Sequence, residues 1–218
     1  MTHNTSKGYV LIHIGKCSGT LLYNFLNKND FKPKIIHHAN YYKSYENNYL
    51  EIDFEEFKDK NIIVCMRHPI SRLISAFNFK YTCRILQNRR SLPIYSNGNQ
   101  KNVDDEIKGF EYFENIQKLG ETLYDESGIM NEKARKFCLS CDHIDYGFHH
   151  YLKNMTNYNN IIVLRHEYLK DDCENNFGLV PDFPKNNLQP NYKSEIYSKI
   201  RTSNKILSVF YLCLRVLK

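Results

Sequence analysis

Two short segments of the chain carry side chains suited to binding an anion. The first is GKCSGT at residues 15–20, which follows an apolar run at 9–14 and opens an amphipathic stretch at 20–27. Small residues allow backbone N–H groups to approach an oxyanion, and the start of a helix adds partial positive charge. A lysine adds a full charge, and two hydroxyl side chains add donors. The residues expected to hold the anion are Gly15, Lys16, Cys17, Ser18, Gly19 and Thr20.

The order of residues in this loop differs from that of a Walker A loop. That motif is G-x-x-x-x-G-K-[ST], in which the lysine is followed directly by a hydroxyl residue. Here Gly15-Lys16 is followed by Cys17, and Val10 stands where the first glycine is required. The pattern argues against an ATPase or a kinase, although a P-loop nucleotide kinase or phosphotransferase stays an alternative. For the loop taken alone, an ordinary glycine-containing strand-to-helix turn is the alternative to an anion-binding loop.

The second segment, RHPISRLIS, begins at Arg67, just after an apolar run at 61–66. Pro69 suits the first turn of a helix, so Ser75 is expected within the first turns of that helix. A guanidinium can bind a phosphate through two hydrogen bonds, and a nearby hydroxyl can add a third. We therefore expect Arg67 and Ser75 to bind one phosphate, with Arg72 adding charge. The alternative is that both arginines are surface charges.

The pattern of apolar residues predicts a layered α/β protein. Continuous β-branched runs are typical of parallel strands that are covered on both faces, and amphipathic stretches follow them. Strands are expected at residues 9–14, 34–37, 61–66 and 160–164, and helices at 20–27 and 71–81. We predict a three-layer fold with a central, mainly parallel sheet flanked by helices. Ligands in such folds bind beyond the carboxyl ends of the strands, where both anion-binding segments fall.

The length of the chain fits one domain with a substantial core. We expect residues 1–218 to form a single domain, within which residues 82–159 are a mainly helical and loop region on the acceptor side. A polar, loop-like stretch is predicted at 92–102. Helices are predicted at 104–123 and 131–139.

The formal net charge of +6 and the pI of about 8.8 fit an anionic partner, whether nucleic acid, a nucleotide or a sulfated or carboxylated glycan, and fit a solvated basic surface equally well. No block of Lys and Arg is long enough for a nucleic-acid arm, so we expect no nucleic-acid partner. A polyanion-binding domain without enzymatic activity stays an alternative. The N-terminal residues lack the apolar region of a signal peptide, and no run reaches the ~18 apolar residues of a membrane span. We therefore expect a cytoplasmic protein.

Seven cysteines at irregular spacing predict free thiols. Cys138 and Cys141 form a lone CxxC pair with His143 nearby. A zinc site needs four ligands, and no second pair has suitable spacing. We therefore predict no metal site.

Taken together, the two anion-binding segments resemble the sulfotransferase superfamily, whose fold is like that of the P-loop NTPases. HIGKCSGT at 13–20 is similar to the family's HIPKTGGT loop, which reads the 5′-phosphosulfate of 3′-phosphoadenosine 5′-phosphosulfate (PAPS). Residues 67–77 are similar to the family's 3′-phosphate motif, with His68 where Asp is commoner. Residues 162–172 resemble a family strand ending in R-Y-E-D-L-x-x-D, and 131–139 resemble a helix near the acceptor. The likeness is greater to glycan-modifying and bacterial members than to enzymes that act on phenols.

The resemblance implies a metal-independent sulfotransferase of EC 2.8.2 type. Such an enzyme moves a sulfuryl group from PAPS to an acceptor hydroxyl, here with a saccharide as the favoured acceptor. Lys16 would stabilise the leaving phosphate while the rest of its loop holds the 5′-phosphate. Arg67 and Ser75 would hold the 3′-phosphate and so select PAPS over an ordinary adenylate.

Transfer to a hydroxyl also needs a base, and histidine is suited because its pKa lies near neutrality. His37 and His38 lie at the end of the weak strand. Adjacent strand residues face opposite sides, so only one of the two can reach the acceptor. The resemblance to related bacterial and glycan enzymes favours His38. We expect His13 to orient the loop, and His149 and His150 are weaker candidates for the base.

Overall fold

The structure, a computed structural model, describes residues 7–37, 54–88, 100–145, 147–152, 155 and 160–183. The described residues divide into two compact units. One comprises residues up to 68 together with those from 148 onward, and the other comprises residues 69–147. The single-domain organisation of residues 1–218 stays a prediction, as does the acceptor-side role of residues 82–159.

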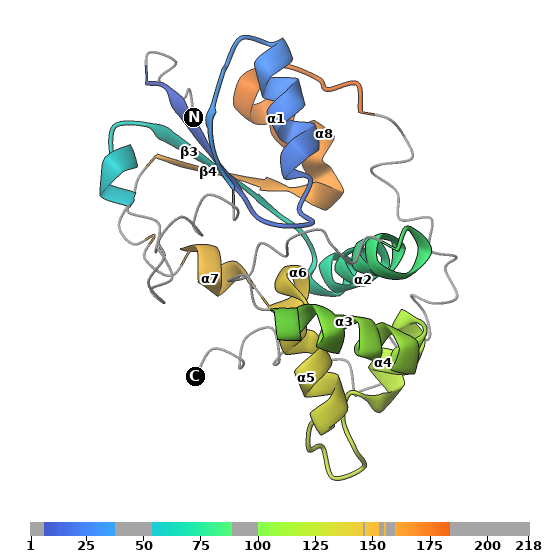
Figure 1. Ribbon diagram of the computed structural model, residues 1–218. Coiled ribbons are helices and arrows are strands. Elements are labelled where there is room, and N and C mark those ends of the chain that lie inside the picture. The colour runs from blue at the N-terminus through green and yellow to red at the C-terminus, as the bar shows by residue number, and fades with distance from the viewer. Residues whose placement is uncertain are drawn as a thin grey trace. The chain divides into compact units, whose positions relative to one another are not determined.

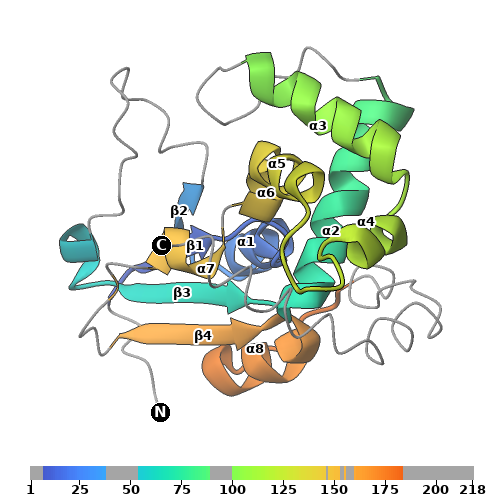
Figure 2. The ribbon, with the colours of Figure 1, turned by 90° about the horizontal axis from the view of Figure 1, so that it is seen from below.

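The first unit, which includes β3, β4, α1 and α8 in Figure 1, is built on a parallel sheet with the strand order β2-β1-β3-β4. Its strands are β1 (Tyr9–His13), β2 (Lys34–His37), β3 (Asn61–Met66) and β4 (Ile161–Arg165). Every strand pair in this sheet is parallel, and Figure 2 shows β3 and β4 as two arrows pointing the same way. The register places Leu11 opposite Ile35 on one side and Ile63 on the other. The predicted α/β fold with a parallel sheet is confirmed.

Both faces of β1 and β3 are buried, which explains their continuous apolar sequences. Helices α1 (Gly19–Lys28) and α8 (Leu169–Phe177) pack against one face, where Leu22 and Leu26 of α1 are fully buried. The sheet residues on that face are Tyr9, Leu11, Ile63, Cys65, Ile162 and Leu164. Those on the other face are Val10, Ile12, Ile62 and Val64, and each is at most 1% exposed. The remaining elements of the unit are η2 (Phe54–Phe57), α7 (Phe148–Leu152) and η4 (His166–Tyr168).

The second unit is helical in its described part. Its elements are α2 (Pro69–Tyr81), η3 (Thr82–Leu86), α3 (Gln100–Phe113), α4 (Ile116–Thr122), α5 (Glu132–Ser140) and α6 (Asp142–Asp145). Its core is a cluster of phenylalanine rings in mostly edge-to-face contact, with the centroids of Phe110 and Phe137 4.9 Å apart. Gly109 lets α3 approach α5, because a Cβ there would lie 2.0 Å from Phe137 Cδ2.

Two sequence predictions for this unit were wrong. The single helix expected over 104–123 is two helices, because Glu114 adopts a φ of 58° and Asn115 caps α4 by accepting from Lys118 N at 2.9 Å. The polar stretch at 92–102 was expected to be a loop, but Gln100 is the first residue of α3, so 100–102 are helical. The rest of that stretch lies outside the described residues.

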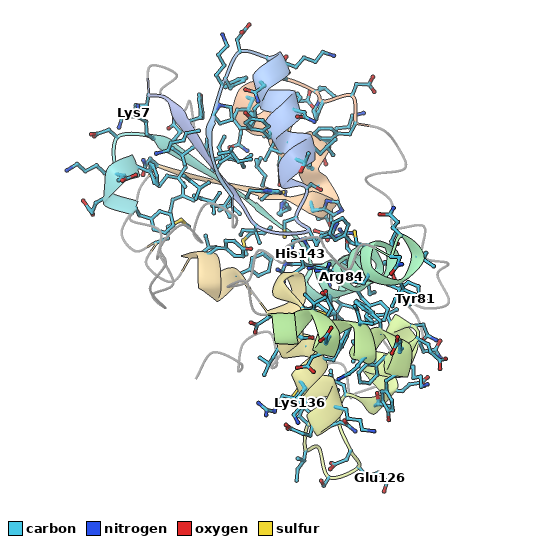
Figure 3. The ribbon with its side chains drawn as sticks, viewed as in Figure 1. Lys7, Tyr81, Arg84, Glu126, Lys136 and His143 are labelled. Atoms are coloured by element: carbon cyan, nitrogen blue, oxygen red, sulfur yellow. The ribbon has the colours of Figure 1, made fainter. Side chains whose placement is uncertain are left out.

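A buried ionic cluster stabilises the second unit. Glu106 of α3 is fully buried; its Oε2 accepts a hydrogen bond from Arg84 Nε at 2.8 Å, and its Oε1 lies 3.5 Å from Lys80 Nζ. Arg84 belongs to η3, a π-helical turn that continues α2, and is labelled in Figure 3. A carboxylate buried this deeply is tolerable because both oxygens face cationic partners.

Candidate functional site

The ends of the parallel strands define where a site can form in the first unit. The chain passes from β1 to β2 on one side of β1 and then returns to β3 on the other side. The strand order therefore reverses between β1 and β3. Ligands of open α/β sheets bind beyond the carboxyl ends of the strands at such a point. The segments that follow β1, β3 and β4 here are residues 14–18, 67–68 and 166–167.

The loop after β1 is a tight turn that leads directly into α1. Cys17 N donates to Ile14 O at 3.2 Å, and the first backbone bond of the helix runs from Leu22 N to Ser18 O. Lys16 and Ser18 both have left-handed backbones, with φ of 65° and 64°. Residues other than glycine pay roughly 1–2 kcal/mol for this conformation, so the surrounding structure must hold the loop in place.

The side chains of this loop face different environments. Cys17 is fully buried, whereas Thr20 is exposed and Lys16 is half-buried. The Cys17 thiol lies in the interior near Cys65, whose pKa is raised mainly by burial and to a smaller extent by Cys17 and Cys173. A cysteine in place of a hydroxyl residue is thus accounted for by its interior position.

Gly19, the first residue of α1, lies in close contact with His13. A Cβ built on Gly19 would come 1.6 Å from His13 Cδ2, which no side chain can do without displacing the ring. The imidazole at the end of β1 therefore lies directly against the backbone at the start of α1. This is the contact that an orienting role for His13 requires.

Arg67 connects the tip of β3 to the loop after β1. Its Nη1 donates to the carbonyl oxygen of Lys16 at 3.3 Å. Its Nε is buried and has no hydrogen-bond partner among the described residues. A buried N–H without a partner is costly, so an acceptor arriving at this place would be stabilised. The guanidinium thus joins the loop with part of its donor capacity still unused.

His166 connects the tip of β4 to the same loop. Its Nδ1 lies 2.6 Å from Ser18 Oγ, and the ring is only 4% exposed. Burial and, to a lesser extent, the positive charge of Arg67 lower the pKa of His166 to about 4, against a smaller opposing effect of Glu167. The imidazole is therefore neutral at neutral pH. Sequence reasoning gave His166 no role, although it lies close to the end of the strand predicted at 160–164 and within the segment 162–172 that resembles a family motif.

The turn that carries His166 is itself fixed at two points. Asp172 of α8 accepts hydrogen bonds from Arg165 N, Nε and Nη2, at 2.6, 3.1 and 2.6 Å. Hydrogen bonding from Arg165 lowers the pKa of Asp172, against a smaller opposing effect of burial. Glu167 Oε1 accepts from the backbone N of His68 at 3.0 Å. The segments after β1, β3 and β4 are thus joined by three hydrogen bonds within one unit.

Several predicted site residues are not placed against this cluster. His38 lies outside the described residues. His37 is the last residue of β2 and pairs in register with His13. Ser75 lies on α2, in the other unit from Arg67. For His149 and His150, in α7, the structure describes only the backbone.

The cysteines within the described part of the chain are free thiols, as predicted. They are Cys17, Cys65, Cys83, Cys138, Cys141 and Cys173. Burial raises the pKa of Cys173 to about 12, so its thiol stays protonated. Across the described residues, no three His, Cys, Asp or Glu side chains lie close enough to hold a metal ion.

The sheet and the loop define an α/β protein in which a tight turn connects β1 to α1. A comparison with protein families matches residues 2–206 to the sulfotransferase family. The match covers most of the chain, so the protein belongs to this family and is a sulfotransferase of EC 2.8.2 type. No curated protein and no solved structure matches the chain. None of the helices in the described part of the chain combines the length and the apolar character that crossing a membrane requires.

Proposed function

We propose that the protein transfers a sulfuryl group from PAPS to an acceptor hydroxyl, with the cluster at the ends of β1, β3 and β4 as the donor site. The observation that carries the proposal is the hydrogen bond from Arg67 to the Lys16 carbonyl, because it holds the Arg67 guanidinium against the backbone of the loop that carries Lys16, at the switch point of the sheet. Family membership supports sulfuryl transfer in general.

The 5′ end of the donor would lie against the loop and the start of α1. The N–H groups in the first turn of a helix have no partner within the helix, and they follow Ser18 directly. The left-handed backbone at Lys16 and Ser18 is of the kind that turns successive N–H groups toward one anion. Gly15 and Cys17 are buried, so we limit their role to shaping the loop.

The 3′ end of the donor would be read by Arg67 and Ser75. The unused Nε of Arg67 suits an additional phosphate oxygen. The role of Ser75 rests on the sequence motif alone, because the two residues belong to different units. Together these contacts would distinguish PAPS from nucleotides that lack a 3′-phosphate.

The chemical step needs alignment, charge neutralisation and a base. The acceptor oxygen attacks sulfur as the bond from sulfur to the bridging phosphate oxygen breaks, and adenosine 3′,5′-bisphosphate leaves. Lys16 would stabilise the charge that develops on the bridging oxygen, without a metal ion. His38 would take the proton of the acceptor hydroxyl. A saccharide is the favoured acceptor because the chain has a net charge of +6 and glycan acceptors are commonly anionic.

Thermal unfolding with two nucleotides tests the donor assignment. We expect adenosine 3′,5′-bisphosphate to raise the melting temperature in the presence of a chelator, because it binds only the folded protein. ATP with Mg²⁺ should have a much smaller effect. Stabilisation by ATP with Mg²⁺ alone would contradict the proposal and favour a phosphotransferase. Binding of any polyanion with a steep salt dependence would instead favour a non-enzymatic polyanion-binding domain.

A further inference from the structure

Ser18 occupies an unusual position for a helix cap. It precedes α1 with φ 64° and ψ 18°, and its side chain makes no capping hydrogen bond to the helix. A serine before a helix ordinarily has an extended backbone and accepts from an N–H of the first turn. Here the hydroxyl is instead directed to His166, 148 residues away in the sequence. The contact therefore serves the loop and not the stability of the helix end.

His166 has little freedom to leave this contact. It is almost completely buried, and its neighbours Arg165 and Glu167 are held by Asp172 and by the backbone of His68. Because the ring is neutral, one of its nitrogens carries a proton and the other carries a lone pair. The direction of the bond to Ser18 therefore depends on which nitrogen is protonated.

The two arrangements differ in what they leave buried. If Ser18 donates to Nδ1, the proton of the ring is on Nε2, which is buried and has no partner among the described residues. Arg67 Nε is also a buried donor without a partner among the described residues, and the positive charge of Arg67 contributes to lowering the pKa of His166. If Nδ1–H donates to Ser18, Nε2 carries a lone pair instead of a proton; it still has no partner among the described residues, but the nearby positive charge of Arg67 favours a lone pair there over an N–H. The second arrangement also leaves the proton of Ser18 available to a ligand.

We propose that His166 is a positioning residue of the donor site, which donates Nδ1–H to Ser18 Oγ and thereby directs the Ser18 proton toward the 5′-phosphate of the nucleotide. The inference rests on the proposed function, since it assumes a nucleotide whose 5′-phosphate meets the loop. It adds a residue that directly follows β4 to a site otherwise formed by the segments after β1 and β3.

The protonation state of the ring can be measured without any ligand. Long-range ¹H–¹⁵N correlation spectra of histidine-labelled protein distinguish the two neutral forms. We expect the His166 signals to show a protonated Nδ1, and Ser18→Ala to shift them. A proton on Nε2 in the unsubstituted protein would overturn the inference.

The effect on binding is tested by comparing two ligands. Calorimetry should show that His166→Ala weakens adenosine 3′,5′-bisphosphate about tenfold. The affinity for adenosine 3′-phosphate, which lacks the 5′-phosphate, should change little. His166→Asn should recover most of the loss, because the Asn Nδ2 stands as many bonds from the backbone as the histidine Nδ1. His143→Ala, in the other unit, is the matched control.

The outcomes separate the two proposals. If the unsubstituted protein does not bind adenosine 3′,5′-bisphosphate, the proposed function fails and the inference fails with it. If the unsubstituted protein binds but His166→Ala binds equally well, only the role of His166 is refuted. An equal loss for both ligands would mean that the ring only supports the fold, and this too would refute the inference. Melting temperatures of all variants identify any that fail to fold.

Discussion

The contact between His13 and Gly19 makes a sharp prediction about the loop. In Gly19→Ala the new methyl carbon would lie 1.6 Å from His13 Cδ2, less than half of an ordinary contact, so the ring or the start of α1 must move. Overpacking of this kind costs about 1–3 kcal/mol, and the better helix propensity of alanine offsets at most about 1 kcal/mol of it. For a chain of this size, each kcal/mol lowers the melting temperature by about 2–4 °C.

The assay combines thermal unfolding with calorimetry using adenosine 3′,5′-bisphosphate. We expect Gly19→Ala to be less stable and to bind more weakly, because the first turn of α1 is displaced. The same change made in a His13→Ala background should cost clearly less, since the clashing ring is gone. Gly120→Ala is the matched control: a Cβ there meets nothing within 4 Å, so alanine should stabilise α4 slightly. If Gly19→Ala is as stable as Gly120→Ala, the close contact is refuted.

Three further predictions address other parts of the protein. Glu106→Gln should lower the free energy of unfolding by about 3–5 kcal/mol, because it leaves Arg84 buried without its counter-charge. A loss of less than about 1 kcal/mol, measured by urea denaturation, would contradict the buried cluster. Acidification should destabilise the protein through His166, because the pKa of about 4 in the folded state lies below the ordinary value of 6.5 and the unfolded chain therefore binds the proton first. The contribution of His166 to the free energy of unfolding is fully present above about pH 6.5 and is lost toward pH 4, by up to about 3 kcal/mol. Urea midpoints across this pH range should fall more steeply in the unsubstituted protein than in His166→Gln. His38→Ala should reduce turnover at least about 100-fold while leaving calorimetric affinity for adenosine 3′,5′-bisphosphate intact, and a collapse of that affinity would place His38 in the nucleotide site.

The sheet could be predicted because its strands are continuous apolar runs. Each of the four strands begins and ends within one residue of the predicted range, and Pro69 begins the helix after β3 as expected. Burial on both faces leaves little choice of residue, so the sequence of such strands is distinctive. The break between α3 and α4 was missed because Asn115 interrupts a stretch whose apolar spacing continues on both sides.

The candidate site was predictable only where its residues are close in the sequence. The loop that contains Lys16 and the segment that begins at Arg67 are local motifs, and the structure joins them through one hydrogen bond. His166 escaped notice because its role depends on a contact with Ser18 across 148 positions, which no spacing rule reveals. The interior position of Cys17 likewise depends on the left-handed backbone of its neighbours Lys16 and Ser18. Sequence predicts such a conformation at glycine, and neither neighbour is a glycine.

The role of Lys16 in sulfuryl transfer is the central claim and can be tested with radiolabelled PAPS. Transfer to a panel of hydroxyl acceptors, saccharides among them, would be compared for the unsubstituted protein, Lys16→Ala and the matched control Lys28→Ala. Lys16→Ala keeps the Cβ at its left-handed position, so the loop should fold with an unchanged melting temperature. We predict that Lys16→Ala loses at least about 100-fold in turnover, because the charge on the leaving phosphate is no longer neutralised, while Lys28→Ala keeps full activity. Near-normal turnover by Lys16→Ala with any accepted substrate would contradict the account.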